Sequence, residues 1–189
     1  MTDKRFNPDK AEVLYSEVRR AMLPVEEVIT YLNLRTEDTV ADLGAGNGYF
    51  TIPLAKKTES QVYAVDIEPK MLALLKVLAV KEELANIRYI QSDLEDIQLK
   101  NHTMDKVVAA FVIHEVPDMP KAISEARRIL KSDGTLLVVE WEDVPTQTGP
   151  LLEDKISSQE MTKLLEQSGF FSEVIHLNES YYAIIAKPI

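Results

Sequence analysis

The chain has 189 residues, 46% hydrophobic and 28% charged, which is the range of a soluble domain with enough apolar material for a core. Its formal net charge of -10 repels phosphate backbones and argues against nucleic acid as a partner. The chain has no cysteine and only three histidines, which excludes disulfides, a thiol nucleophile and cysteine-based metal sites, so no metal centre is expected.

The first 35 residues are expected to form helices. Asn7 and Pro8 suit an N-cap and a first helical position, and apolar residues follow at helical spacing. A second helix is expected to begin at Pro24. The N-terminal residues are polar, and no window reaches the roughly 18 apolar residues of a membrane span. The sequence therefore predicts a cytoplasmic protein without a membrane span.

Beyond residue 36, short apolar runs alternate with amphipathic segments. Strands are predicted at 39–43, 61–67, 86–93, 105–116, 134–142, 171–177 and 181–188, and helices at 50–58, 69–83, 120–131 and 158–169. Near-continuous apolar strands that alternate with helices are typical of a parallel sheet covered on both faces. The last two strands form a hairpin, which makes the sheet mixed at one edge. We predict a single α/β domain, 1–189, with N-terminal helices (1–35) and a doubly wound core (36–189).

Three of the six glycines of the chain lie in the loop Gly44–Gly48, directly after the first core strand and Asp42. Glycines let the backbone turn sharply and let a ligand approach it closely, and ligands of open α/β sheets bind at the carboxyl ends of the strands. The loop therefore indicates a nucleotide-like ligand. The alternative is a tight strand–helix turn.

Acidic residues near the loop favour one class of ligand. The dinucleotide fingerprint needs a glycine at position 49, which is Tyr49. Asp66 ends the second strand and suits the ribose of NAD or of S-adenosylmethionine, or else caps the next helix. Asp42 would repel a pyrophosphate and attract a cation. Asp93, with Leu94, is placed to hold an adenine. Three carboxylates suit a ligand that carries a sulfonium and an ammonium.

In these segments the chain resembles the class I S-adenosylmethionine-dependent methyltransferases. The matching segments, in order, are VADLGAGNGYF, VYAVDIEPKML, IQSDLEDI, MDKVVAAFVIHEV and ARRILKSDGTLLVVEW. The chain is similar to small single-domain enzymes near the ubiquinone/menaquinone-biosynthesis C-methyltransferases. This resemblance implies a Rossmann-like, seven-stranded, mostly parallel sheet, an activity of class EC 2.1.1 and S-adenosylhomocysteine as product. The implied cofactor-binding residues are Asp42, Gly44, Ala45, Gly46, Asn47, Gly48, Asp66, Ile67, Met71, Asp93, Leu94, Ala110 and Phe111.

Several residues are candidates for the acceptor side of the site. His114 is the candidate general base, and its alternative role is to satisfy backbone groups in the loop before Pro117. Trp141 would be a wall of the acceptor pocket or part of the core. Tyr15 and Arg19 would close over the cofactor or pack as an ordinary amphipathic helix. The segment 142–157 is long enough for a lid, or is a surface crossover.

The favoured interpretation is transfer of a methyl group to a small-molecule acceptor by in-line displacement. A nicotinamide-dependent oxidoreductase is the alternative that Asp42 and Tyr49 disfavour. A non-catalytic module that binds S-adenosylmethionine is the other alternative. The sequence leaves the acceptor and the oligomeric state open, with a homodimer among the options.

Overall fold

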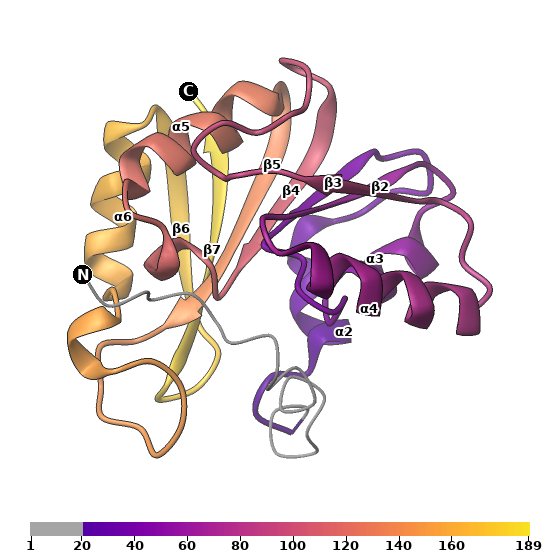
Figure 1. Cartoon of the computed structure of the whole chain (residues 1–189). Helices are drawn as coiled ribbons and strands as arrows, with labels where there is room; N and C mark the ends of the chain where they lie inside the picture. Colours follow the sequence, from indigo (N-terminus) through magenta and orange to yellow (C-terminus); the bar gives the residue numbers. More distant parts are fainter. Residues whose placement is uncertain (1–20) are drawn as a thin grey trace.

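The computed structural model describes residues 21–189, which contain one seven-stranded sheet of order β3-β2-β1-β4-β5-β7-β6 (Figure 1). β1 to β5 are parallel, and β7 is antiparallel to both of its neighbours, β5 and β6. The predicted doubly wound sheet with an antiparallel edge hairpin is therefore confirmed. The strands are β1 (Val40–Leu43), β2 (Val62–Asp66), β3 (Ile87–Gln91), β4 (Met104–Ala110), β5 (Leu130–Trp141), β6 (Phe170–His176) and β7 (Tyr181–Pro188).

Helices lie on both faces of the sheet, and three of them, α4, α5 and α6, begin at side-chain caps. The Ser157 hydroxyl accepts a hydrogen bond from the Glu160 N–H at 3.2 Å and starts α6, and the Asp118 carboxylate does the same for α5. The helical elements are α2 (Val25–Val28), η2 (Ile29–Leu32), α3 (Thr51–Lys57), α4 (Pro69–Lys81), η3 (Ile113–Glu115), α5 (Met119–Ile129), η4 (Leu152–Asp154) and α6 (Ser158–Gln167).

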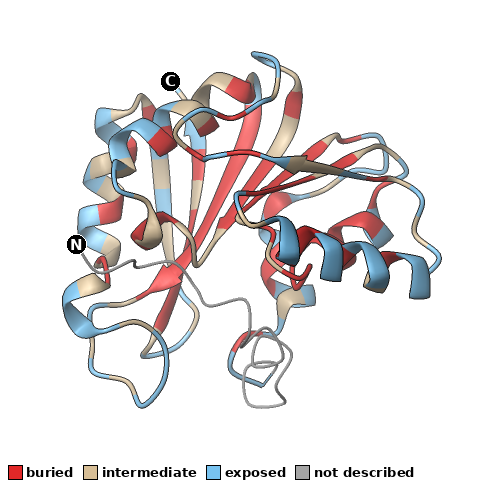
Figure 2. Cartoon of the chain, viewed as in Figure 1, coloured by how far each residue is buried: buried red, intermediate tan, exposed pale blue. Residues whose placement is uncertain are grey.

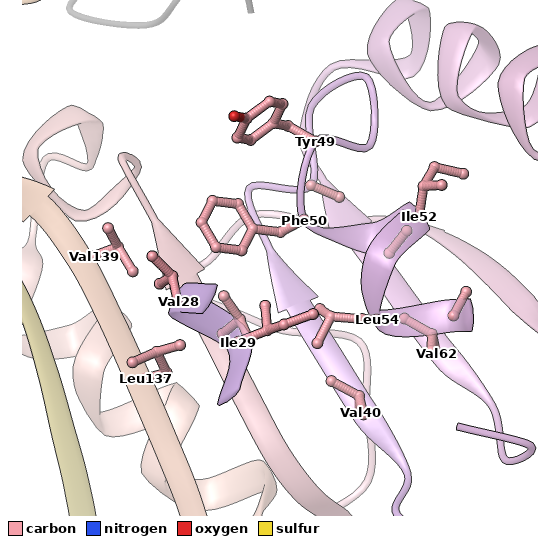
Figure 3. Packing of buried hydrophobic residues seen from close by; sticks show 14 of the residues in the cluster. Val28, Ile29, Val40, Tyr49, Phe50, Ile52, Leu54, Val62, Leu137 and Val139 are labelled. Carbon is pink, nitrogen blue, oxygen red and sulfur yellow. The ribbon is translucent and has the colours of Figure 1, made fainter. Parts of the chain in front are cut away.

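The sheet separates two hydrophobic cores, which Figure 2 shows as buried strands between half-buried helices. Successive side chains of a strand point to opposite faces, so Val40 belongs to one core and its neighbour Ala41 to the other. α2, η2, α3 and α4 contribute to the first core, part of which Figure 3 shows around Ile29 and Phe50. α5 and α6 contribute to the second core. Both faces are thus covered, as near-continuous apolar strands require.

Two element boundaries differ from the prediction by four residues or more. β4 ends at Ala110 and not at residue 116, because Phe111 has a φ of 56° and turns the chain into η3. β5 begins at Leu130 and not at residue 134, and so includes the end of the helix that we predicted at 120–131. The register between β4 and β5 shifts between Met104 and Lys106, which pair with Leu130 and Thr135. β5 accommodates its additional residues there as a bulge and continues as one strand.

Candidate active site

The glycine loop lies at the carboxyl end of the sheet, where the parallel strands β1, β2 and β4 end. The Gly44 and Ala45 N–H groups donate to the Val65 carbonyl at 2.8 and 3.0 Å, which holds the loop against β2. Gly44, Gly46 and Gly48 have φ values of 69°, 53° and 99°, which side chains rarely tolerate. The sequence of the loop is therefore dictated by its backbone geometry.

At two of the three glycines, the atoms that come close to the backbone belong to other side chains of this chain. A Cβ on Gly44 would lie 2.4 Å from the Val112 side chain, and a Cβ on Gly48 would lie 2.3 Å from that of Leu75. Val112 follows β4 and Leu75 lies on α4, so both contacts depend on the three-dimensional arrangement. The glycines therefore fix the loop against its neighbours, besides their predicted role toward a ligand.

Asp66 at the end of β2 is held by two backbone groups. Its Oδ2 accepts the Gly46 N–H at 2.7 Å, and its Oδ1 accepts the Glu68 N–H at 2.8 Å. Burial raises the pKa of the Asp66 carboxyl, although these N–H groups oppose the rise. α4 is capped by the Glu68 carboxylate and does not require Asp66 for this purpose. Each Asp66 oxygen retains capacity to accept a hydroxyl donor.

Asp42 is the most buried of the three carboxyls predicted to bind the cofactor. It is 2% exposed, and the Thr51 hydroxyl donates to its Oδ2 at 2.5 Å. Within residues 21–189 no lysine, arginine or histidine nitrogen forms an ion pair with it. Burial raises the pKa of Asp42 to about 7, and the negative charge of Asp66 adds to the rise. A cation would relieve this cost, whereas a pyrophosphate would increase it, so the site fits the ammonium of S-adenosylmethionine.

The structure distributes the other predicted cofactor residues along the same edge. Asp93 is exposed beyond β3, and its Oδ1 accepts the Glu95 N–H at 2.9 Å. Leu94 is buried in the second core, on the face of the sheet opposite to Asp42. Ile67, Met71, Ala45, Asn47 and Ala110 are at or near the ends of β1, β2 and β4, with Met71 and Ala45 buried and Ile67 exposed.

An aromatic cluster extends the site beyond β4. The Phe111 ring makes edge contacts with Trp141 and Tyr181, with centroids 5.8 and 5.3 Å apart, and the other two rings are 4.7 Å apart. Phe111 has the left-handed φ noted above, a strained conformation that is common at functional sites. Trp141 is 6% exposed and belongs to the first core. Tyr181 was not predicted, because its place beside Trp141 depends on the pairing of β5 with β7.

The segment 142–157 is docked against Trp141. The Lys155 ammonium lies 5.0 Å from the centroid of the Trp141 ring and donates to the Val144 carbonyl and the Thr146 hydroxyl, both at 2.7 Å. A Cβ on Gly149 would lie 2.5 Å from the same ring. Burial lowers the pKa of Lys155. The segment therefore covers Trp141 and is tied to it at two points.

His114 is paired with a buried carboxylate. Its Nδ1 lies 2.8 Å from the Glu140 Oε2, and Glu140, which is fully buried, also accepts the Ile113 and Trp141 N–H groups. Burial disfavours the charged imidazole, but the charge and hydrogen bond of Glu140 outweigh it, so the pKa of His114 is raised. Glu140 and Trp141 point to opposite faces of β5. The role of His114 as a base stays a prediction, and the observed partner of its ring is the Glu140 side chain and not a backbone group of the loop before Pro117.

Two predicted residues, Tyr15 and Arg19, lie outside the described residues. Within residues 21–189 no group of acidic and histidine side chains could hold a metal ion.

Residues 41–138 match a protein family described as a methyltransferase domain, which is more than half of the chain. The chain belongs to this methyltransferase family. It is 34% identical over 136 residues to a ubiquinone/menaquinone biosynthesis C-methyltransferase of Rhizobium etli, a match that includes 69% of this chain and 51% of that protein. The chain thus spans about half the length of the curated relatives it matches.

Solved structures agree with this family membership. A SAM-dependent methyltransferase from Aquifex aeolicus superposes with a TM-score of 0.91 at 26% identity, over 98% of this chain and 100% of that one. A protein from Pyrococcus horikoshii shares the fold with a TM-score of 0.80 at 19% identity, over 98% and 100% of the two chains. The predicted methyltransferase family is confirmed, and the predicted cofactor, S-adenosylmethionine, is the one for which the Aquifex aeolicus protein is named.

Proposed function

We propose that this methyltransferase-family chain transfers a methyl group from S-adenosylmethionine to a small-molecule acceptor by in-line displacement. The observation that carries the proposal is the buried Asp42 carboxyl, which has no cationic partner within residues 21–189. A nicotinamide dinucleotide would bring two negative charges toward this carboxyl, so the oxidoreductase alternative is disfavoured. The cofactor, when bound, supplies an electrophilic methyl group on a sulfonium.

Each of the three acidic residues at the strand ends would recognise a different part of the cofactor. Asp42 would face the ammonium, Asp66 would accept the ribose hydroxyls, and Asp93 would accept the exocyclic amine of adenine. The N–H contacts that position Asp66 support its part, since they fix the carboxylate before the ligand binds. The loop Gly44–Gly48 would lie along the methionine portion, with Ala110 and Phe111 beside the sulfonium. Ile67, Met71 and Leu94 would border the adenine.

The acceptor is proposed to bind beside the aromatic cluster of Phe111, Trp141 and Tyr181. The contacts among the three rings and their position beyond β4 support this placement. Because the segment 142–157 covers Trp141, it would have to move for Trp141 to contact an acceptor. The Rhizobium etli relative is named for C-methylation in quinone biosynthesis, which supports a small organic acceptor.

Catalysis would depend mainly on holding the acceptor and the methyl group in line, which can contribute about 7–11 kcal/mol. A base is needed only where the acceptor must lose a proton, and His114 could accept it at Nε2 because Nδ1 faces Glu140. Full turnover of His114→Ala with an identified acceptor would remove the base from the mechanism.

We further propose that residues 1–189 form a single domain. Support comes from Val28 and Leu32, which precede the sheet in the chain but are buried in the same core as Val40.

Thermal unfolding with S-adenosylmethionine, S-adenosylhomocysteine, NAD and NADP tests the proposed function. A ligand at about 100 times its dissociation constant adds roughly 2.7 kcal/mol, which raises the midpoint by about 5–11 °C for a domain of this size. We expect a rise with the two sulfur-containing ligands alone. A rise with NAD or NADP instead would refute the proposal.

A further inference from the structure

The outward side of α4 exposes three large apolar side chains. Val77 and Val80 are each 71% exposed and Leu74 is 41% exposed, whereas Leu75 on the inward side is fully buried. Figure 2 shows the outward side of the helix as exposed along most of its length. A single exposed valine needs no explanation, but three on one helix face form a surface that can bind something apolar.

The charged side chains within α4 itself are all basic. α4 carries Lys70, Lys76 and Lys81, all exposed, and contains no aspartate or glutamate. These lysines contribute +3 to the formal net charge of -10, so the rest of the chain carries -13. Lysines are thus concentrated around the exposed apolar side chains of an otherwise acidic protein.

The two kinds of side chain alternate around the outward face. At 100° per residue, Leu74, Val77 and Val80 fall on the same half of the helix as the three lysines, opposite the inward residues. Such a face can place apolar side chains among lipid acyl chains while the ammonium groups contact anionic head groups. With 13 residues α4 is too short to span a bilayer, and no helix within residues 21–189 could do so.

We propose that this face, made by Lys70, Leu74, Lys76, Val77, Val80 and Lys81, docks on the surface of a membrane that contains anionic lipids. Charge complementarity favours an anionic membrane as the binding partner of this face, because an acidic protein is repelled from an anionic surface everywhere except at a basic face. α4 begins three residues after Asp66 (69 − 66 = 3), so docking would bring the cofactor-binding edge of the sheet close to the bilayer.

Co-sedimentation of the full chain with vesicles tests the proposal. One vesicle type is pure phosphatidylcholine and the other contains roughly 30% phosphatidylglycerol. We expect at least about tenfold stronger association with the anionic vesicles at low salt, and weaker association as salt is added. Val77→Gln with Val80→Gln should reduce this association to the level of neutral vesicles, and Lys76→Gln with Lys81→Gln should do the same.

A matched control variant distinguishes an effect of the α4 face from an effect of the net charge of the chain. Lys121→Gln with Lys163→Gln removes the same charge from exposed positions on α5 and α6 and should bind anionic vesicles as the natural chain does. All substituted side chains are exposed, so unchanged thermal midpoints would show that the variants fold.

Three results would overturn the proposal: equal association with both vesicle types, undiminished association of the α4 variants, and an equal loss in the control variant. Sedimentation equilibrium identifies the competing occupant. If Val77→Gln with Val80→Gln converts a dimer into a monomer without any change in lipid association, the face binds a second copy of the chain and not a membrane.

Discussion

Asp42→Asn removes the charge from the buried carboxyl and leaves its shape and the acceptor for the Thr51 hydroxyl in place. Burial raises the pKa of Asp42 from 3.8 to about 7. Ionisation therefore costs the folded chain more than it costs the unfolded chain. We predict that the ligand-free asparagine variant is more stable than the natural chain at pH 8.

The magnitude follows from the pKa. A rise from 3.8 to about 7 corresponds to about 4 kcal/mol at roughly 1.4 kcal/mol for each pH unit. Below pH 3.8 the carboxyl is protonated in both states, and the natural chain has the full stability of the neutral form. That stability is lost as the pH rises toward 7 and is absent above it. Because structural relaxation reduces such costs, we expect Asp42→Asn to gain about 2–4 kcal/mol at pH 8 and almost nothing at pH 4.

Urea unfolding of both chains at a series of pH values between 4 and 8.5 measures this difference. The stability difference should grow between pH 4 and pH 7 and then level off. The same variant should bind S-adenosylhomocysteine more weakly at pH 8, because it has no charge for the ammonium. A stability difference that does not change with pH would refute the assignment of Asp42 as a buried carboxyl that no basic side chain within residues 21–189 neutralises.

Three further predictions concern the loop, the histidine pair and the segment 142–157. Gly44→Ala should lower the free energy of unfolding in urea by about 2–4 kcal/mol, because the added Cβ would lie 2.4 Å from a side chain. Gly169→Ala has a φ of 80° but open space around the added Cβ, so it should cost only about 1 kcal/mol. Equal costs for the two variants would contradict this prediction. Glu140→Gln should destabilise the chain more at pH 6 than at pH 9, because the His114 imidazole loses its positive charge as the pH rises through its raised pKa, and the ion pair with Glu140 is lost with it. A loss of stability that is the same at both pH values would contradict the ion pair. Lys155→Met should make the segment 142–157 more sensitive to limited proteolysis than the surface control Lys163→Met, and identical cleavage of the two would contradict the docking.

Local sequence pattern was sufficient to predict the fold and the positions of Asp42 and Asp66 at the carboxyl ends of β1 and β2. Apolar runs that alternate with helices predicted the parallel sheet, and the spacing of Asp42, Gly44 and Asp66 placed the loop at the correct edge. These features depend on neighbours in the chain and on the rule that ligands bind at the carboxyl ends of parallel strands.

Contacts between distant segments could not be predicted. The pairing of His114 with Glu140 joins residues 26 positions apart and depends on η3 folding back over the end of β5. Tyr181 reaches Trp141 only because β7 inserts antiparallel beside β5. The contact of Val112 with Gly44 likewise requires β1 and β4 to be neighbours. Each of these contacts is fixed by strand order and register, to which local sequence patterns are insensitive.

Calorimetric titration of the natural chain and of Asp66→Ala with S-adenosylhomocysteine tests whether the cofactor binds at the carboxyl ends of β1 and β2. We predict binding by the natural chain and at least about tenfold weaker binding by the variant, since a hydrogen bond to a charged group contributes about 1.5–3 kcal/mol. Unchanged affinity in Asp66→Ala would contradict the placement of the cofactor at the carboxyl ends of β1 and β2.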